Sequence, residues 1–247
     1  MEHHASYLAI CLTDLLVRLG WMERKAWGAF AHGQPLSILE RYDHLFAAVL
    51  AALVTVAVVL YARRRLERIP GPYQQTMEFL VGFVGGLAAD NIHHHPDRYV
   101  PLIGTLGFFV LLNNLFGLAP GMPSGTGNWN VTLGAALVVF FYYNFHGMRE
   151  HGVGKYLGHF AGPVWFLWVL MWPLEVLGLF SRILSHSLRL FGNIAGEHVV
   201  AGIFFSLVPL LIPVPLMVMG LFFGLIQTFV FIMLATIYIS GAVAHEH

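Results

Sequence analysis

The residues between Glu197 and Glu246 include no Asp, Glu, Lys or Arg. Over the whole chain of 247 residues, 57% are hydrophobic and only 11% are charged, whereas a soluble domain usually carries about 25% charged residues. In lipid, apolar runs of this length satisfy their backbone hydrogen bonds as helices. The sequence therefore predicts an all-α polytopic membrane protein in contact with a lipid bilayer.

The charge balance and the cysteine content exclude several other classes. The formal net charge is zero with histidine neutral, so nothing indicates a nucleic-acid partner. Cys11 is the sole cysteine, which excludes an intramolecular disulfide and any cysteine-based metal site. The HHHPDR run at 93–98 favours a solvated loop over a metal site, because Pro96 breaks a helix there. We expect no metal and no cofactor.

The chain divides into three parts. Residues 1–44 form an N-terminal outer or interfacial segment, with a short helix over 5–21 and a loop over 22–43. Residues 45–162 contain membrane helices and a cytoplasmic re-entrant hairpin. Residues 163–247 form a long, strongly tilted helical hairpin that packs against a partner.

Within the middle part, the confident spans are 45–61, 100–118 and 129–144. Residues 73–91 are too polar for a simple span, so they predict the re-entrant or interfacial arm. Residues 146–159 contain Arg, Lys and several glycines and predict a cytoplasmic loop. The basic run ARRRLER at 62–68 stays cytoplasmic by the positive-inside rule, which places the N-terminus outside and the C-terminus inside.

The C-terminal part combines a helix that starts between Pro163 and Pro173 and runs to about Leu207, a turn at 209–215 and a last helix over 216–242. At about 100° per residue, six polar residues of the first helix share an arc of about 80°. A charge at the centre of a bilayer helix costs roughly 2.5–3.5 kcal/mol, so this stripe indicates function. Its members are Glu175, Arg182, His186, Arg189, Asn193 and Glu197.

Small residues flank the stripe. Gly178, Ser185 and Gly192 recur every seven residues and leave a groove for a closely packed helix. Gly220 and Gly224 form a second small-xxx-small pair on the last helix, which predicts antiparallel packing of the two helices.

The stripe suits proton movement past a fixed charge. Arginine stays protonated at any accessible pH, so Arg189 acts as a barrier and not as a relay. Glutamate and histidine exchange protons, whereas asparagine and glutamine orient water by hydrogen bonds. The arrangement predicts two aqueous half-channels separated by Arg189, with a partner's carboxylate carrying the proton between them. The groups that line these paths are Glu175, His186, Asn193, Glu197 and Gln227.

Several motifs resemble one known family. They are SHSLRLFGN, AGEH, IQTFVFIMLATIYIS, PGPYQQTMEFLVGFV, LLNNLFGLAP and NWNVTLGAAL, and they are similar to subunit a of the F-type ATP synthase over roughly residues 40–247. The resemblance implies a proton-channel stator subunit that couples proton translocation to ATP synthesis and is not an enzyme by itself. It implies the c-ring and the peripheral-stalk b subunits as partners, and a bacterial inner membrane as location.

The resemblance also implies roles for individual residues. Arg189 matches the essential arginine that faces the c-ring carboxylate, and Gln227 matches the polar residue near it on the last helix. Asn193 matches an asparagine of the outer half-channel and Glu175 an acid of the inner one. Asn114 and Asn130 match asparagines near the outer entrance.

The outer relay has two candidates, because the family usually has one more residue between RLFGN and AGE. Either Glu197 with a deletion or His198 without a gap takes this position. Helix geometry favours Glu197, about 80° from Arg189, over His198, about 180° away. The chain also departs from the family at Asn128, where an acid is common, and at Gly220, where some members have histidine.

Two other classes compete with this interpretation. A secondary transporter of a small solute or ion would show internal repeats, which the sequence lacks. A membrane haem protein would need facing axial histidines, and the suitably separated pair His146 and His159 lies in the expected loop.

Overall fold

The structure, a computed structural model, describes residues 39–64, 67, 70–93, 95–118, 124–152, 154, 156, 168–207 and 213–244. Every regular element in these ranges is helical, which confirms the predicted all-α class. The α-helices are α3 (Leu39–Arg64), α4 (Pro72–Asn91), α5 (Val100–Leu118), α6 (Trp129–His151), α8 (Trp168–Leu207) and α9 (Pro213–Val243), and the short 3-10 turns are η1 (Pro96–Arg98) and η2 (Gly125–Gly127).

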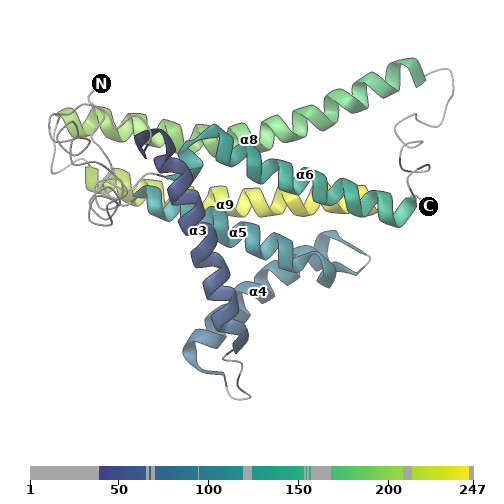
Figure 1. The fold of residues 1–247 in the computed structure, drawn as a ribbon, viewed down its shortest axis with the longest axis horizontal. Helices are drawn as coiled ribbons and strands as arrows, with labels where there is room; N and C mark the ends of the chain where they lie inside the picture. The colour runs from purple at the N-terminus through teal and green to yellow at the C-terminus, as the bar shows by residue number, and fades with distance from the viewer. Residues whose placement is uncertain are drawn as a thin grey trace, which may run out of the picture.

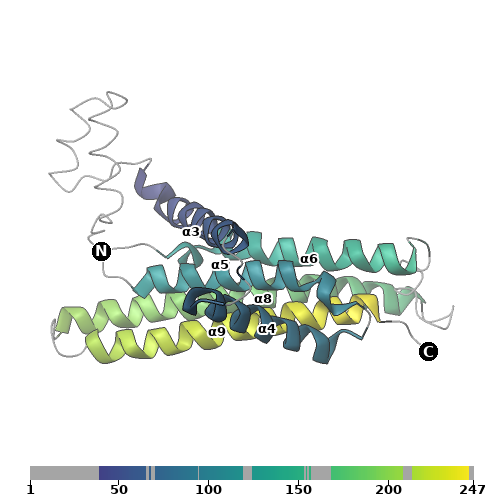
Figure 2. The same cartoon turned by 90° about the horizontal axis from the view of Figure 1, so that it is seen from below.

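Four helices form an elongated bundle. Helices α5, α6, α8 and α9 run side by side along the long axis of the molecule (Figures 1 and 2). Helix α9 contacts all three of the others, and α8 also packs on α6. Helix α3 crosses the bundle steeply and meets α5, while α4 lies against α5 and α9 (Figure 1). The bundle is thus built around α9.

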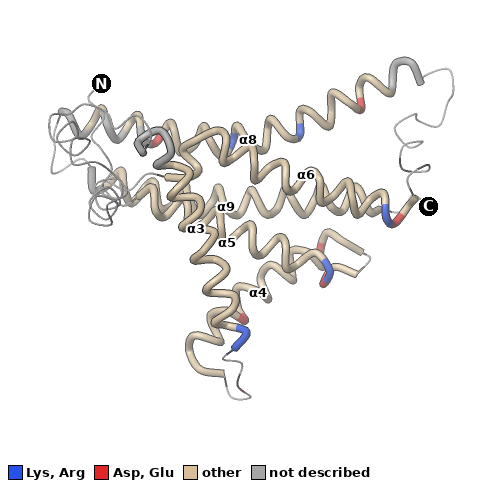
Figure 3. Tube along the Cα trace, in the orientation of Figure 1, with Lys and Arg blue, Asp and Glu red and all other residues tan. Residues whose placement is uncertain are grey.

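Among the described residues, four helices are long and apolar enough to cross a membrane. These segments are His44–Arg64, Val100–Leu118, Trp129–His151 and Pro215–Val243. Charged residues gather at helix ends and along α8 (Figure 3). Helix α8 has 40 residues, nearly twice the length needed to span the bilayer at a rise of about 1.5 Å per residue. It therefore combines unusual length with unusual charge.

The core lies where α4, α5, α6, α8 and α9 meet. Aliphatic and aromatic side chains from all five helices pack there. The least exposed members include Ile103, Val110, Val139, Leu190, Phe231 and Ile239. Large apolar side chains also cover much of the outer surface, as expected for helices that face lipid or another subunit.

Two expected loops are partly helical. Helix α3 begins at Leu39, so residues 39–43 are not part of a loop. Helix α6 continues to His151 instead of ending at Asn144, with Arg149 and His151 in its last turn.

Helix α8 has the expected bounds, and Pro173 lies within its first turns. Helix α9 begins at Pro213, three residues before the expected start, because proline fits the first turn of a helix. The helix expected over 5–21, the loop over 22–38 and residues 209–212 of the outer turn lie outside the described residues.

Candidate functional site

Helix α8 has one buried face and one open face. Ser187, Leu190 and Ile194 are buried, and the Ser187 hydroxyl lies 3.3 Å from the Thr132 hydroxyl at the start of α6. Arg189 is exposed on the other side of the helix. The polar stripe predicted from the sequence runs along the border of the two faces, so its members lie in different environments.

Arg189 is exposed on the open face of α8. It lies in the middle of α8, and within the described part of the chain no carboxylate forms an ion pair with it. Within about two turns of it, a Cβ atom added to Gly192 or Gly196 would meet nothing within 4 Å, and the same holds for Gly178 about three turns earlier in the helix. This face therefore presents a fixed cation next to an open row of small residues.

Asn193 and Glu197 lie together near the far end of α8. Both line a cavity of about 260 Å³ between α8 and α9. The Glu197 carboxylate lies directly against Gly220 of α9, where any Cβ would overlap with it. The glycine that departs from the family pattern is therefore the residue that makes room for this acid. The side chain of His198, the other candidate relay, lies outside the described residues.

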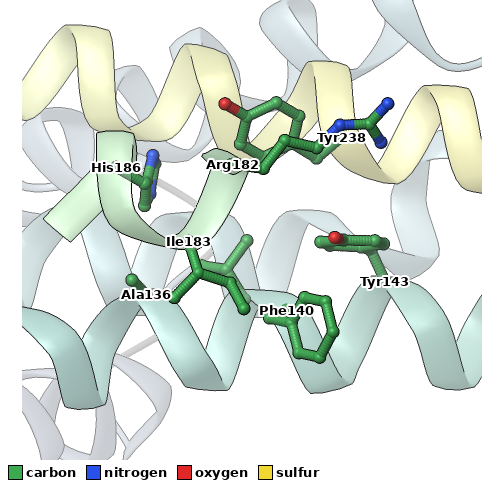
Figure 4. Close-up of a pocket in the computed structure, with 8 residues that line it drawn as sticks. Ala136, Phe140, Tyr143, Arg182, Ile183, His186 and Tyr238 are labelled. Atoms are coloured by element: carbon green, nitrogen blue, oxygen red, sulfur yellow. The ribbon is translucent and has the colours of Figure 1, made fainter. Parts of the chain in front are cut away.

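His186 differs from its neighbours in the stripe. Its side chain is only 3% exposed, and its ring packs at 4.0 Å between centroids on Phe231 of α9. Arg182 stays exposed, with its guanidinium 5.8 Å from the centre of the Tyr238 ring. Figure 4 shows His186 and Arg182 pointing towards α9 from consecutive turns of α8. Glu175, further towards the start of the helix, is half-buried.

Asn114 is the centre of a buried hydrogen-bond network. Its side-chain amide donates to the Gly224 carbonyl at 3.1 Å and to the Thr228 hydroxyl at 3.2 Å on α9. Its carbonyl oxygen accepts from the Thr126 hydroxyl at 3.0 Å. Thr126 in turn lies 2.8 Å from the Ser124 hydroxyl. The network ties the η2 turn and α5 to α9, one residue from the buried Gln227.

The second predicted entrance residue lies elsewhere. Asn130 is exposed in the first turn of α6, and its backbone N–H donates to the Asn128 side chain at 2.9 Å. Asn128 is thus the N-cap of α6. The structure therefore separates Asn130, at the surface, from the buried network of Asn114.

Sequence reasoning missed three buried residues, two in the Asn114 network and one on α6 near the stripe. Ser124 and Thr126 lie in a Gly-rich segment that signals only a turn, although both are buried. Tyr143, buried on α6 opposite Arg182, has no local signal because it lies in a generally aromatic run. In the described part of the chain, no group of three or more His, Cys, Asp or Glu side chains is arranged to hold a metal ion.

Comparison with known proteins gives a consistent answer. Residues 45–240 match the sequence family described as ATP synthase A chain. The chain is 45% identical over 221 residues to ATP synthase subunit a 1 of Syntrophotalea carbinolica, covering 88% of this chain and 94% of that protein. It is 40% identical to ATP synthase subunit a of Geotalea uraniireducens, covering 87% and 93% of the two chains. It is 41% identical to ATP synthase subunit a of Helicobacter hepaticus, covering 82% of this chain and 91% of that protein.

Proposed function

This chain belongs to the ATP synthase A chain family, and from that premise we propose that it is the proton-channel stator subunit of an F-type ATP synthase. It is a membrane-sector component of that complex, while ATP chemistry belongs to other subunits. Its partners are the c-ring, the peripheral-stalk b subunits and the surrounding lipid. Membership of this family decides against the secondary transporter and the haem protein.

The observation that carries the mechanism is the exposure of Arg189 beside open glycines on α8. A helix of the c-ring can approach closely along such a row of small residues. Its carboxylate then meets a permanent cation, which favours the deprotonated form of the acid. A proton that moved straight along α8 would be repelled at the same point. Arg189 therefore promotes release of the proton from the carboxylic acid and separates the two half-channels.

The two sides of Arg189 supply the proton paths. On one side, the cavity with Asn193 and Glu197 forms the outer half-channel, in which Glu197 is the relay. The buried Gln227 and the Asn114 network continue the route inside the bundle. A proton from this side neutralises the c-ring carboxylate, so that the ring can turn into lipid. On the other side, His186 and Glu175 accept the proton that the carboxylate releases after nearly a full turn. Asn130 marks the outer surface.

The topology that supports this assignment follows from the basic residues. Arg63 and Arg64 close α3, and Arg149 lies in the last turn of α6. Arg98, just before α5, pairs with Glu150 at 3.2 Å, so the start of α5 and the end of α6 share one side. By the positive-inside rule this side is cytoplasmic. The chain then sits in a bacterial inner membrane with its N-terminus outside and its C-terminus inside, and α4 is a re-entrant or interfacial arm.

The decisive experiment is ATP-driven proton pumping by inverted membrane vesicles that contain the complex with Arg189→Ala. We expect pumping to be abolished while assembly is retained, because the c-ring carboxyl group loses the cation that promotes its deprotonation. Arg149→Ala is the matched control, since it removes an exposed cation from α6, and it should leave pumping within about twofold of normal. Normal pumping with Arg189→Ala in an assembled complex would overturn the proposal.

A further inference from the structure

A cavity of about 330 Å³ lies between α3, α4 and α5, outside the proposed proton path. Its walls come from the last turns of α3, the middle of α4 and the first half of α5, and they are almost entirely apolar. Val59 and Val81 at its rim are 51% and 59% exposed, whereas Val84, which also lines it, is only 9% exposed. The cavity is therefore open at its rim and closed against the bundle.

The walls and the depth of this cavity suit a hydrocarbon chain. Thr105 contributes the one polar side chain among the lining residues, and its hydroxyl already donates to the Pro101 carbonyl at 2.6 Å. The lining side chains therefore offer no unpaired polar group to a ligand. Val58 and Val59 lie roughly 8–9 Å along α3 from its end at Arg64, which places the cavity in the apolar layer just inside the membrane surface.

The end of α3 supplies positive charge beside this apolar cavity. Arg63 follows Val59 by four residues, so it lies on the same face of α3, roughly 6 Å further towards the end of the helix. Arg63 and Arg64 are exposed, and within the described part of the chain neither forms an ion pair with a carboxylate (Figure 3). In the sequence, the run 62–68 contains four arginines and one glutamate. This end of the cavity therefore favours an anionic group.

Tyr73 at the start of α4 links the cavity to this basic end. Its ring packs edge-on against Tyr61 of α3, with 5.2 Å between the centroids. Its hydroxyl donates to the Val58 carbonyl at 3.4 Å. Met77, four residues later on the same face of α4, lines the cavity. Because tyrosine is enriched at the level of lipid headgroups, this pair marks the place where the apolar cavity meets the membrane surface.

We propose that this cavity is a binding site for an anionic phospholipid, with one acyl chain between α3, α4 and α5 and the headgroup phosphate at Arg63. A phospholipid combines an apolar tail and an anionic head in one molecule, and it enters from the bilayer through the open rim. Basic pockets between helices on the cytoplasmic side of a membrane suit such headgroups. The bound lipid completes the packing of α3 and α4, which both lie against α5. This inference goes beyond the proposed function and takes from it only the orientation in the membrane.

Photolabelling of the assembled complex with lipid probes tests the site. The complex is reconstituted in phosphatidylcholine vesicles that contain a trace of phosphatidylglycerol or phosphatidylcholine with a diazirine at the same acyl carbon. The labelled residues are then identified by mass spectrometry. Val84 reports on the cavity, and Leu53, which is 62% exposed on α3, reports on ordinary contact with the bilayer.

We expect the ratio of Val84 to Leu53 labelling to be at least about fivefold higher for the phosphatidylglycerol probe, which is the factor that one arginine near an anionic headgroup contributes. Absence of label at Val84 would mean that the cavity is closed or is filled by a helix of another subunit. Equal ratios for the two probes would mean ordinary bilayer contact. Either result overturns the proposal.

A pair of glycine variants tests the site of the acyl chain. Gly104→Leu adds a side chain to the cavity wall, where a Cβ would lie 4.0 Å from Val84. Gly86→Leu is the control, because it adds the same side chain to α4 at a position where a Cβ would meet nothing within 4 Å. We expect only Gly104→Leu to abolish the labelling of Val84. Equal labelling of the two variants would contradict a chain bound in the cavity.

A pair of arginine variants tests the site of the headgroup. Arg63→Gln should lower the preference for the phosphatidylglycerol probe about fivefold, whereas Arg149→Gln, which removes an exposed arginine at the end of α6, should leave it unchanged. An equal preference in both variants would contradict the assignment of the phosphate to Arg63. The readout does not depend on pumping, so an unlabelled cavity combined with defective pumping by Arg189→Ala would reject the lipid site and leave the proposed function intact.

Discussion

The contact between α5 and α9 and the open face of α8 use similar residues in opposite ways. Both contain glycines at positions suited to close helix packing. At the α5–α9 contact, a Cβ added to Gly107 would lie 2.7 Å from Ile232, and one added to Gly224 would lie 3.3 Å from Asn114. On α8, a Cβ added to Gly192 would meet nothing within 4 Å. The first contact is complete within the described chain, and the second face is open, as the proposed contact with the c-ring requires.

The polar groups show the same difference. Asn114 uses its amide and its carbonyl oxygen in hydrogen bonds that stay inside the chain. Arg189 is exposed, and no described carboxylate pairs with it. A satisfied polar group stabilises one packing arrangement, whereas an unpaired cation in a membrane helix costs free energy until a partner neutralises it. Under the proposed function, stability and function are therefore carried by different helix faces.

The largest effect on stability is expected for Asn114→Leu. This change keeps the side-chain volume and removes three buried hydrogen bonds, to Gly224, Thr228 and Thr126. We expect the free energy of unfolding in mixed micelles to fall by about 2–3 kcal/mol, since each such bond contributes about 1 kcal/mol. Denaturation of the purified subunit, followed by the loss of helical circular dichroism, measures this change.

The matched control is Asn193→Leu on α8, where the native side chain is half-buried beside a cavity. We expect a loss below about 0.5 kcal/mol, because a half-exposed amide has solvent or lipid headgroups as alternative partners. Equal losses for the two variants would show that α8 is as complete within the chain as the α5–α9 contact. The comparison between the two regions would then fail.

The sequence was sufficient to predict the helical class and the bounds of α8. These features depend on local signals, namely hydrophobic length and helical period. The burial of His186 was not predictable, because an arc of about 80° is compatible with either face of the helix. The orientation is decided by what packs on the other side, and here Phe231 of α9 covers the imidazole.

The hydrogen-bond network was predictable only in part. Asn114 was identified from its resemblance to family members, but its partners Thr126 and Thr228 lie 12 and 114 residues away in the sequence. No periodicity or motif in a single sequence connects positions so far apart. The extension of α6 to His151 was missed for another reason, since the charged residues and glycines of 146–159 made a helical segment look like a loop.

An intermediate effect on the free energy of unfolding is expected when one methyl group is added at a packed glycine of α5 and at an open glycine of α8. Gly107→Ala forces Ile232 to move, which should lower the free energy of unfolding by about 1 kcal/mol even after the gain in helix propensity. Gly192→Ala meets no obstacle and should raise it by up to about 1 kcal/mol. The same denaturation assay measures both values. A loss for Gly192→Ala would mean that this part of α8 is already covered within the chain.

The smallest effect on the free energy of unfolding is expected from Tyr156, which packs against α6 from the segment that follows it. Its hydroxyl donates to the Asn144 side chain at 3.0 Å, its ring lies against Gly147, and burial raises its pKa from 10.0 to about 12. The folded protein keeps this proton at a pH where the unfolded chain loses it. The resulting stabilisation is therefore complete below pH 10 and disappears as the pH rises towards 12. Because Tyr156 is only partly buried, we expect the loss to be at most on the order of 1 kcal/mol. Between pH 10 and 12, the free energy of unfolding should fall more steeply for the native chain than for Tyr156→Phe. Parallel curves for the two chains would show that the Tyr156 hydroxyl is as well solvated in the folded protein as on an open surface.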